Sequence, residues 1–376
     1  MRTLLICLVA LCIVGATGGY CYWTAQRPAG HYLADLRIAV DVNQGTPGDK
    51  GNLLGIQPQL YPGDYQSLAR LHLKLAAYLQ RADRLGLLNA KTVVVLPEHV
   101  GSGLWARGEK DELYQASGQH EAHRWLALSN PLPFALAYLR ATGKTRLDDA
   151  LLRMRAPRMA QDYQQLFGGL AREFGITLVA GSIILPEPHV SSGVLRIGDG
   201  ALFNSSVVFG PAGTPLGQPQ RQLTAEFATR GYLAQPSTPT FEVVTTPAGK
   251  LGILIGADSL HPSHYRQLDR LGAELIAMPA SLAGDGLWHK PWRGFPGLST
   301  PEPISLKPGE VSEGEAWHRL TLTGQSAISQ ARASVTVFSA GKLWDQLAAG
   351  QSFAVTNGQT YSVSDKPGAR LINLWL

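Results

Sequence analysis

NLLGIQ at residues 52–57 and TVVVLPE at residues 92–98 enclose the stretch of sequence that decides the fold. Between them, leucine and alanine recur at the spacing of an amphipathic helix over residues 68–85. Both enclosing segments contain continuous apolar runs, which are typical of strands that are covered on both faces. Strand, helix and strand in this order predict a βαβ unit in an α/β protein.

Helices and strands alternate along the rest of the chain as well. The predicted elements are a helix at 159–174, strands at 177–184, 202–209, 241–246 and 250–256, a helix at 265–271 and a strand at 273–279. Two segments depart from this alternation, namely residues 116–157, in which Asn130-Pro131-Leu132-Pro133 separates two helical stretches, and the glycine- and proline-rich residues 284–315. We expect both to be insertions or loops over one edge of a layered α/β sandwich.

The N-terminal residues 1–26 form an apolar segment with no charged residue between Arg2 and Arg27. A run of about 20 apolar residues is long enough to span a bilayer core of about 30 Å. The segment is therefore a signal anchor or a signal peptide. Its length and the aromatic residues at positions 20, 22 and 23 favour an anchor, whereas the small residues of Val14-Gly15-Ala16 offer a cleavage site.

The positive charge at Arg2 favours a cytoplasmic N-terminus. The body is then expected to face the periplasm while anchored in the inner membrane, or to be secreted if the segment is cleaved. Residues 27–51 are predicted to be a tether, because turn residues surround a short apolar run at 36–42. Residues 52–376 are predicted to be one large domain, since 45% hydrophobic composition can supply one extensive core.

Charge and cysteine content exclude several classes of function. The net charge of +5 is spread without runs, so no nucleic-acid partner is expected, and the membrane is expected as a partner only through the N-terminal segment. Cys7, Cys12 and Cys21 all lie in that segment, so the body has no thiolate nucleophile, disulfide or cysteine-ligated metal.

Histidine pairs give no metal motif either. The pairs at positions 120 and 123 and at positions 261 and 264 lack the four-residue spacing of a helical zinc motif. We expect these histidines to be exposed to solvent or to lie in loops. No metal and no cofactor are predicted.

Four blocks of sequence, read in order, resemble the carbon–nitrogen hydrolase (nitrilase) superfamily. They are residues 55–57 with 93–98, residues 178–182 with 203–213, residues 249–258 with 272–281, and residues 326–330 with 339–341. The resemblance implies a nitrilase-like α-β-β-α sandwich, distantly similar to the outward-facing nitrilase-like domain of apolipoprotein N-acyltransferase. In this family a cysteine thiolate attacks a nitrile, amide or ester carbon, a glutamate moves protons, and a lysine stabilises the oxyanion.

The resemblance assigns catalytic positions to particular residues. Glu98 matches the glutamate, Gly256 stands at the nucleophile position, and Gln220 or Arg221 stands at the lysine position. Glu226 lies where many members have a supporting glutamate. The strands leading to Glu98 and Gly256 are expected to lie side by side, with their carboxyl ends opening into one pocket. Alternatively, Glu98 is a structural carboxylate that caps a helix or pairs with an arginine.

Residues around these positions have simpler expected roles. Asp258 is expected to orient loops around the nucleophile turn, and Ser259 to point away from the site. Ser329 replaces an acidic residue that is common in the family. An aromatic group in the second insertion either forms a lid beside the pocket or packs against the domain; it comprises Trp288, His289, Trp292 and Phe295.

Two classes of function remain open. The first is a pseudoenzyme that binds a small-molecule or envelope-protein ligand, or acts as a scaffold, and the missing cysteine and lysine favour it. The second is a divergent hydrolase or acyltransferase that acts on amide, nitrile or ester bonds through Glu98 with water or a non-cysteine nucleophile. Either class is compatible with a homo-oligomer.

Overall fold

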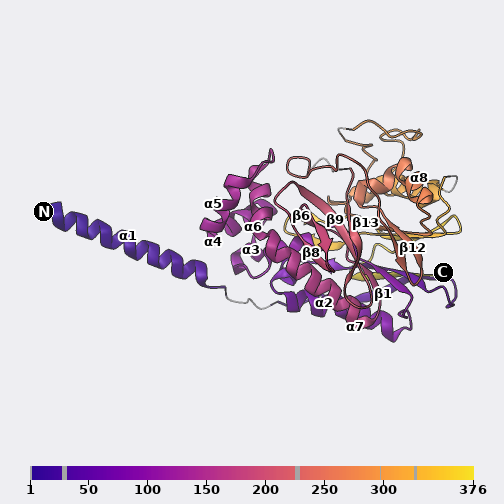
Figure 1. The fold of residues 1–376 in the computed structure, drawn as a ribbon, viewed down its shortest axis with the longest axis horizontal. Helices are drawn as coiled ribbons and strands as arrows, with labels where there is room; N and C mark the ends of the chain where they lie inside the picture. The colour runs from indigo at the N-terminus through magenta and orange to yellow at the C-terminus, as the bar shows by residue number, and fades with distance from the viewer. Residues whose placement is uncertain (1, 28–31, 225–228, 297, 326–327) are drawn as a thin grey trace.

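The computed structural model describes residues 2–27, 32–224, 229–296, 298–325 and 328–376. Two sheets pack face to face in the centre of the body, and helices cover both outer surfaces (Figure 1). This is the α-β-β-α sandwich that the sequence predicts.

The first sheet has the strand order β1-β19-β2-β4-β5-β9-β10, and β6 pairs with β9 beside this path. Its strands are β1 (Ile38–Gln44), β2 (Asn52–Gln57), β4 (Thr92–Val95), β5 (Thr177–Val179), β6 (Ile183–Pro186), β9 (Leu202–Phe209), β10 (Pro215–Arg221) and β19 (Ala369–Trp375). Strands β2 and β4 are parallel and are joined through α2 (Leu68–Arg84), which confirms the predicted βαβ unit.

The predicted strand at 177–184 is wrong as a single element. Gly181 adopts a φ of 62°, in the left-handed region, and it separates β5 from β6. Both short strands still pair with β9, so the turn at Gly181 redirects the chain within the same sheet.

The second sheet has the strand order β11-β12-β13-β14-β17-β18. Its strands are β11 (Val243–Thr246), β12 (Gly249–Ile253), β13 (Leu275–Pro279), β14 (Ala333–Val337), β17 (Phe353–Thr356) and β18 (Gln359–Ser362). The strand that leads to Gly256 is therefore in the opposite sheet from the strand that leads to Glu98. The expectation that these two strands lie side by side is wrong, because they approach each other across the sandwich instead.

Short strands complete the body at its edges. β3 (Gln59–Leu60), β15 (Ala340–Leu343) and β16 (Gln346–Leu347) form one small sheet, and β7 (His189–Ser191) and β8 (Val194–Arg196) form a hairpin.

Three apolar layers hold the sandwich together. One lies between the first sheet and α2, α6 (Arg146–Tyr163) and α7 (Gly169–Phe174); one lies between the sheets; and one lies between the second sheet and α8 (Pro262–Arg270) and α9 (Glu313–Leu320). Because β4 has a layer on each face, Val93, Val94 and Val95 are all fully buried. Burial of each such side chain contributes roughly 1.5–3 kcal/mol relative to exposure.

The segments outside the predicted sandwich also have regular structure. Residues 38–44, within the predicted tether, form β1, which pairs in parallel with β19 at the edge of the first sheet. In the first insertion, α4 (Gln119–Ser129) and α5 (Pro131–Arg140) are separated at Asn130, as predicted, and α3 (Asp111–Gln115) precedes them. The predicted helix at 159–174 begins earlier, with α6, and is interrupted by a π-helical turn at Gln164–Gly168 before α7.

The second insertion packs into the core. Trp288, Trp292 and Phe295 are buried among the apolar side chains between the second sheet and α9. Ring contacts join Trp288 to Phe338 and Trp292 to Phe295. Packing against the domain, and not a lid, is therefore the arrangement of these three side chains.

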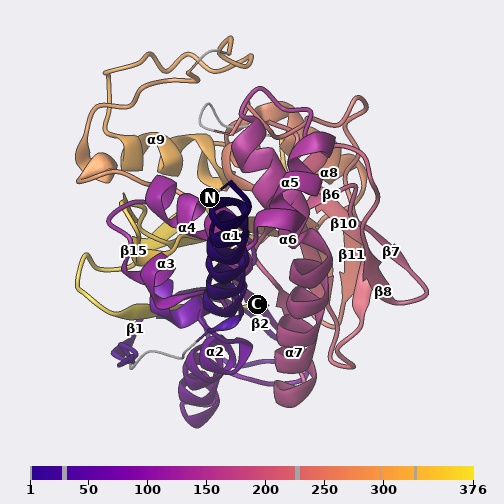
Figure 2. The same ribbon diagram turned by 90° about the vertical axis from the view of Figure 1, so that its left-hand side faces the viewer.

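The N-terminal helix α1 (Arg2–Ala25) extends away from the body (Figures 1 and 2). Within the described part of the chain, it is the one helix long and apolar enough to cross a membrane. Its residues are not buried against the body, as expected for a membrane anchor or a signal sequence.

Candidate functional site

Glu98 lies just beyond the end of β4, and its side chain is buried. The following residue, His99, has a φ of 62°, so the chain turns sharply after the glutamate. The His99 N–H donates to the Ser182 hydroxyl at 2.8 Å, which ties this turn to the segment that follows β5. The local backbone therefore directs the Glu98 side chain into the interior.

Gly181 allows the two strand ends to approach closely at this turn. A Cβ atom at position 181 would lie only 2.0 Å from the carbonyl oxygen of Pro97, the residue before Glu98. No side chain fits at that distance without movement of the backbone. Gly181 is thus required both for its positive φ and for the position of the segment that carries Glu98.

Two amide side chains contact the Glu98 carboxylate. Asn204, on β9, donates from Nδ2 to Glu98 Oε1 at 2.8 Å, and Gln222, which follows β10, donates from Nε2 to the same oxygen at 3.1 Å. The amides are also linked, because Asn204 Nδ2 donates to Gln222 Oε1 at 3.1 Å. All three side chains are buried. They form a polar cluster, which we call the Glu98 cluster.

Gly256 meets the Glu98 cluster from the opposite sheet. It begins a 3₁₀ turn, Gly256–Leu260, after β12 and has a φ of 52°. A Cβ atom at position 256 would lie 2.7 Å from Glu98 Oε2 and 2.9 Å from Gln222 Nε2. The structure therefore brings Glu98 and Gly256 together, and the two polar side chains occupy the space where a side chain at position 256 would begin.

The two residues expected at the lysine position do not join this cluster. The Arg221 guanidinium lies over the Phe203 ring at 4.3 Å, and its Nη2 donates to the Pro188 carbonyl at 3.3 Å. Gln220 donates from Nε2 to the Thr240 carbonyl at 3.2 Å. Gln222 takes the place beside Glu98 instead.

Strand register explains why Gln222 is the residue that lies beside Asn204 and Glu98. Its backbone N–H donates to the carbonyl of Asn204 at 2.8 Å, so the two amides are neighbours across the strands. The sequence contains both residues, but spacing alone does not show which residue near the end of β10 turns inward. The supporting glutamate expected at Glu226 lies outside the described residues.

Asp258 fastens the turn at Gly256 to the segment that follows β10. Its carboxylate accepts hydrogen bonds from the backbone N–H groups of Leu223 at 2.9 Å and Thr224 at 2.7 Å. These contacts agree with the loop-orienting role expected of it. They also connect the turn at Gly256 with the chain that carries Gln222.

The serines near the site make local contacts. Ser259 is buried, and its hydroxyl donates to the Gly256 carbonyl at 2.6 Å, so it points back into the turn. The Ser329 hydroxyl accepts from the Ala331 N–H at 3.3 Å. Neither contact places a hydroxyl in the Glu98 cluster.

Burial lowers the pKa of His99 to about 4, so this ring is neutral at pH 7. His99 Nε2 lies 3.7 Å from Glu98 Oε1 and therefore brings no positive charge to the carboxylate at that pH. These described neighbours of the carboxylate, two amides and an imidazole, are neutral at pH 7, and the amides act as hydrogen-bond donors.

The histidines of the two pairs differ in exposure, since His120 is exposed, as expected, and the others are partly or fully buried. His123 is buried on α4, 3.1 Å from Asp148 Oδ1, so a loop or solvent position is wrong for this residue. His261 and His264 stack with ring centroids 5.0 Å apart, and burial lowers the pKa of both, to about 4 for His261. Among the described residues, no group of three or more His, Cys, Asp or Glu side chains has a metal-binding arrangement.

A small cavity adjoins Glu98. Its volume is about 70 Å³, and its lining includes Tyr65, Glu98, His99 and Ser339. Pockets for drug-sized ligands usually measure roughly 300–1,000 Å³. The cavity can hold a few water molecules. A surface cavity of about 460 Å³, lined by Lys290 and Arg293 among others, shares Ala283 with it.

Comparisons with known proteins agree with the architecture. A family profile described as carbon-nitrogen hydrolase matches residues 56–321, more than half of the chain. The structure is similar to an amidase from Nesterenkonia sp., with a TM-score of 0.51, 15% identity, and coverage of 88% of this chain and 92% of that one. It is also similar to a carbon-nitrogen hydrolase from Helicobacter pylori G27, with a TM-score of 0.53, 18% identity, and coverage of 86% and 88%. No curated protein matches the sequence.

Proposed function

Because the chain belongs to the carbon-nitrogen hydrolase family, we propose that it is a membrane-anchored, exported member without covalent acyl chemistry, which serves as a binding or scaffold module. One observation carries this proposal. At the turn where the family places its nucleophile, Gly256 offers no side chain, and Glu98 and Gln222 occupy the adjoining space.

The chemistry of the cluster supports the same conclusion. A covalent nucleophile divides a difficult acyl transfer into two easier steps, and glycine cannot supply one. A lysine ammonium would stabilise a developing oxyanion, whereas Gln222 is neutral and donates to Glu98. The carboxylate and its two amides are hydrogen-bonded to one another, as in a structural polar network.

The size of the cavity beside Glu98 limits which ligands can bind there. The sequence leaves open a small molecule or an envelope protein, and a cavity of about 70 Å³ is small for most organic ligands. The surface cavity of about 460 Å³ is large enough for a small ligand, so a small molecule stays a candidate beside a protein partner that binds on the surface of the body. Homo-oligomerisation is one form such a partner could take.

We expect no turnover of amides, nitriles or esters above the buffer rate by the full-length protein in detergent. The measurement is product release across substrate panels, with the Glu98→Gln variant as the control. Turnover that Glu98→Gln abolishes would establish the alternative, a divergent hydrolase in which Glu98 activates water from the adjoining cavity. Turnover that Glu98→Gln does not change would show that the site lies elsewhere.

We expect the body to lie on the outer side of the inner membrane. Arg2 and the N-terminal amino group precede the apolar helix, and positive charge is retained on the cytoplasmic side. A reporter enzyme that is active only after export, fused after Leu376, should be active. A reporter that is active only in the cytoplasm should be silent at the same position, and the reverse pattern would disprove the orientation.

A further inference from the structure

Helix α5 presents an apolar face to solvent. Leu132, Leu136 and Leu139 follow one another at spacings of four and three residues, so they share one side of the helix. These side chains are 76%, 63% and 77% exposed, and Leu128 at the end of α4 is 52% exposed. We call these four leucines the α5 face.

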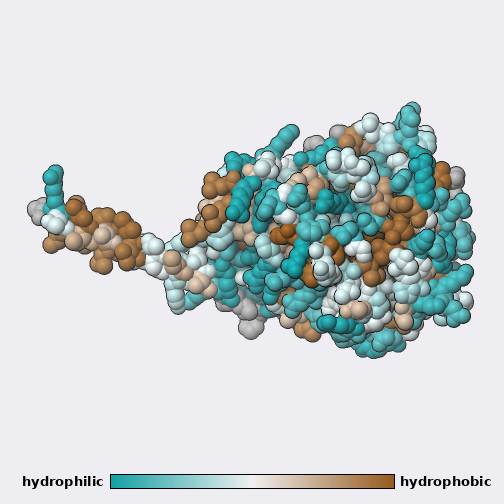
Figure 3. Space-filling view, viewed as in Figure 1, coloured by the Kyte–Doolittle hydropathy of each residue, from teal (hydrophilic) through white to brown (hydrophobic). Residues whose placement is uncertain are grey.

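The opposite side of α5 is packed against the body. Ala137 of α5, Ala141 just after it and Ala150 of α6 form a small buried cluster, with Phe134 and Met154 packed against it. The α5 face is therefore the side turned away from this contact. A surface view shows hydrophobic residues gathered at the end of the body nearest α1 (Figure 3).

The α5 face lies beside the end of the apolar helix α1. The Tyr20 hydroxyl donates to the Leu128 carbonyl at 2.5 Å, and the rings of Trp23 and Trp125 are 6.4 Å apart. Two perpendicular views place α4 and α5 next to the point where α1 reaches the body (Figures 1 and 2).

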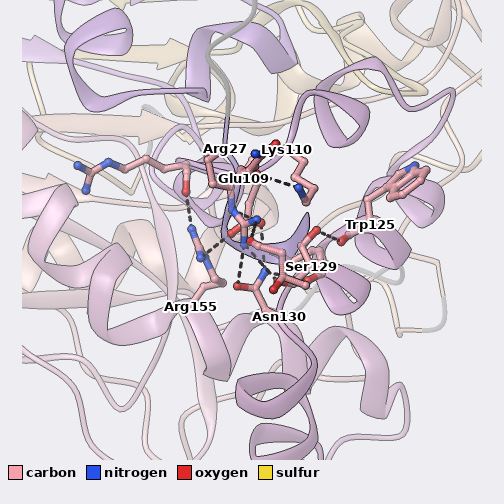
Figure 4. Close-up of polar contacts among 12 residues, drawn as sticks. Arg27, Glu109, Lys110, Trp125, Ser129, Asn130 and Arg155 are labelled. Carbon is pink, nitrogen blue, oxygen red and sulfur yellow. Dashed lines mark hydrogen bonds and ion pairs between the residues drawn. The ribbon is translucent and has the colours of Figure 1, made fainter. Parts of the chain in front are cut away.

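Buried polar contacts hold this junction in one geometry (Figure 4). The Glu109 carboxylate accepts from Arg155 Nη1 at 2.9 Å and from Asn130 Nδ2 at 3.1 Å, and Arg27 Nε lies 3.6 Å from it. Glu109 is buried. It thus links the residue between α4 and α5, helix α6 and the chain that leaves α1.

Lys110 reinforces the same junction from the next position in the chain. Its ammonium donates to the carbonyls of Trp23 and Gln26, the latter at 2.8 Å, and lies over the Trp23 ring at 4.2 Å. Carbonyls at a helix C-terminus lack partners within the helix, so a cation there is favourable. The orientation of α1 relative to α4 and α5 is therefore specified by several contacts.

The position of α1 in a bilayer determines the depth of the α5 face. A helix of 24 residues is about 36 Å long, enough to cross a hydrocarbon core of about 30 Å. Tyr20 and Trp23 are then at the membrane–water interface, where such side chains concentrate. The Leu128 carbonyl accepts a hydrogen bond from Tyr20, so Leu128 lies at the same depth relative to the bilayer.

Charge on α5 and after it complements a lipid surface. Arg140, Lys144 and Arg146 are exposed, close in sequence to the last leucine of the face. Basic residues beside an apolar stripe are typical of interfacial helices, because they pair with lipid phosphates while the apolar side enters the acyl boundary.

We propose that the α5 face is a second membrane contact, which inserts into the interfacial region of the leaflet where α1 emerges. Its occupant is the phospholipid bilayer, with the basic residues near anionic headgroups. The body is then held against the membrane surface in a defined orientation and does not swing freely on a tether. This inference requires that α1 is retained, but it is independent of whether the Glu98 cluster is catalytic.

The test is fluorescence quenching by lipids in the full-length protein. The three natural cysteines, all in α1, are replaced by serine, a single cysteine is introduced as Leu136→Cys, and a bimane fluorophore is attached. The protein is placed in nanodiscs of phosphatidylcholine and phosphatidylglycerol with brominated or ordinary acyl chains. Because interfacial helices sit about 5–10 Å into the boundary, brominated chains should quench the label by about two-fold or more.

A matched control uses Leu271→Cys in the same background. Leu271 is also exposed, at 42%, but it follows α8 on the other side of the sandwich. Its fluorescence should be equal in both lipids. Equal quenching at the two positions, or none at Leu136→Cys, would overturn the proposal.

Three further measurements separate the remaining explanations. Intact-mass analysis of the purified protein should show α1 present, and a mass lacking it would overturn the proposal without bearing on catalysis. Crosslinking through the unlabelled thiol of Leu136→Cys, without lipid quenching of the labelled protein, would assign the face to a second copy of the chain and refute the lipid contact. The variant Leu132→Glu with Leu139→Glu should abolish quenching while the circular dichroism spectrum is unchanged.

Discussion

Gly181→Ala is expected to lower the free energy of unfolding by about 3–5 kcal/mol, or to prevent folding, because it combines a left-handed backbone with overpacking. The φ of Gly181 is 62°, and the new Cβ would lie 2.0 Å from the Pro97 carbonyl oxygen. Relief of this contact requires movement of the segment that carries Glu98. The measurement is urea denaturation of the full-length protein in detergent, followed by circular dichroism.

Gly175→Ala is the matched control for this prediction. Gly175 has nearly the same φ, 63°, but no atom lies within 4 Å of the position that a Cβ would take. Only the cost of the backbone conformation remains, about 1 kcal/mol. The difference between the two variants therefore measures the contact with Pro97. Equal losses would contradict the close approach of β5 and the Glu98 turn.

The double variant Gly256→Cys with Gln222→Lys is expected to be acylated by an activated ester about 10²-fold faster than Gly256→Cys with Arg221→Lys, since a single oxyanion donor contributes that much to the rate. A side chain at position 256 begins beside Glu98 and Gln222. Arg221 instead lies over Phe203, away from the cluster. The measurement is burst release of the ester's leaving group, followed by detection of the acyl adduct by mass spectrometry.

The outcome decides which residue stands at the lysine position. Equal rates for the two double variants would contradict the assignment of Gln222. Adding Glu98→Gln to the faster variant should reduce its rate of acylation. The glutamate lies within reach of the new thiol and can accept its proton. Both variants are expected to lose stability, because the positive φ of Gly256 costs about 1 kcal/mol and the new side chain must displace the end of the Glu98 side chain, so rates are compared at a temperature well below unfolding.

The strands near the centre of each sheet are predictable from sequence because their environment is uniform. Both faces of β4 are covered, so its residues form one apolar run that ends where the chain leaves the sheet at Pro97. β9 is predicted with its observed ends, Leu202–Phe209, for the same reason. The blocks that carry these strands also carry Glu98 and Gly256.

The edges of the sheets are less predictable. β1 has only one buried residue, so its sequence does not differ from that of a tether, and it becomes a strand because β19 comes from the far end of the chain to pair with it. The α5 face is a similar case. Its leucine spacing is visible in the sequence, but whether those leucines point into the body or away from it depends on how α5 packs on α6.

The layered α/β class, the apolar N-terminal helix, and a glutamate and a glycine at the ends of two buried strands are all predictable from the amino-acid sequence. These follow from hydrophobic periodicity and residue identity, which are local properties of the chain. Long-range contacts are needed to show that these two strands belong to opposite sheets and that Gln222, and not Arg221, contacts Glu98. Such choices depend on register and on contacts between residues distant in sequence, because a shift of one residue in a strand moves a side chain to the other face.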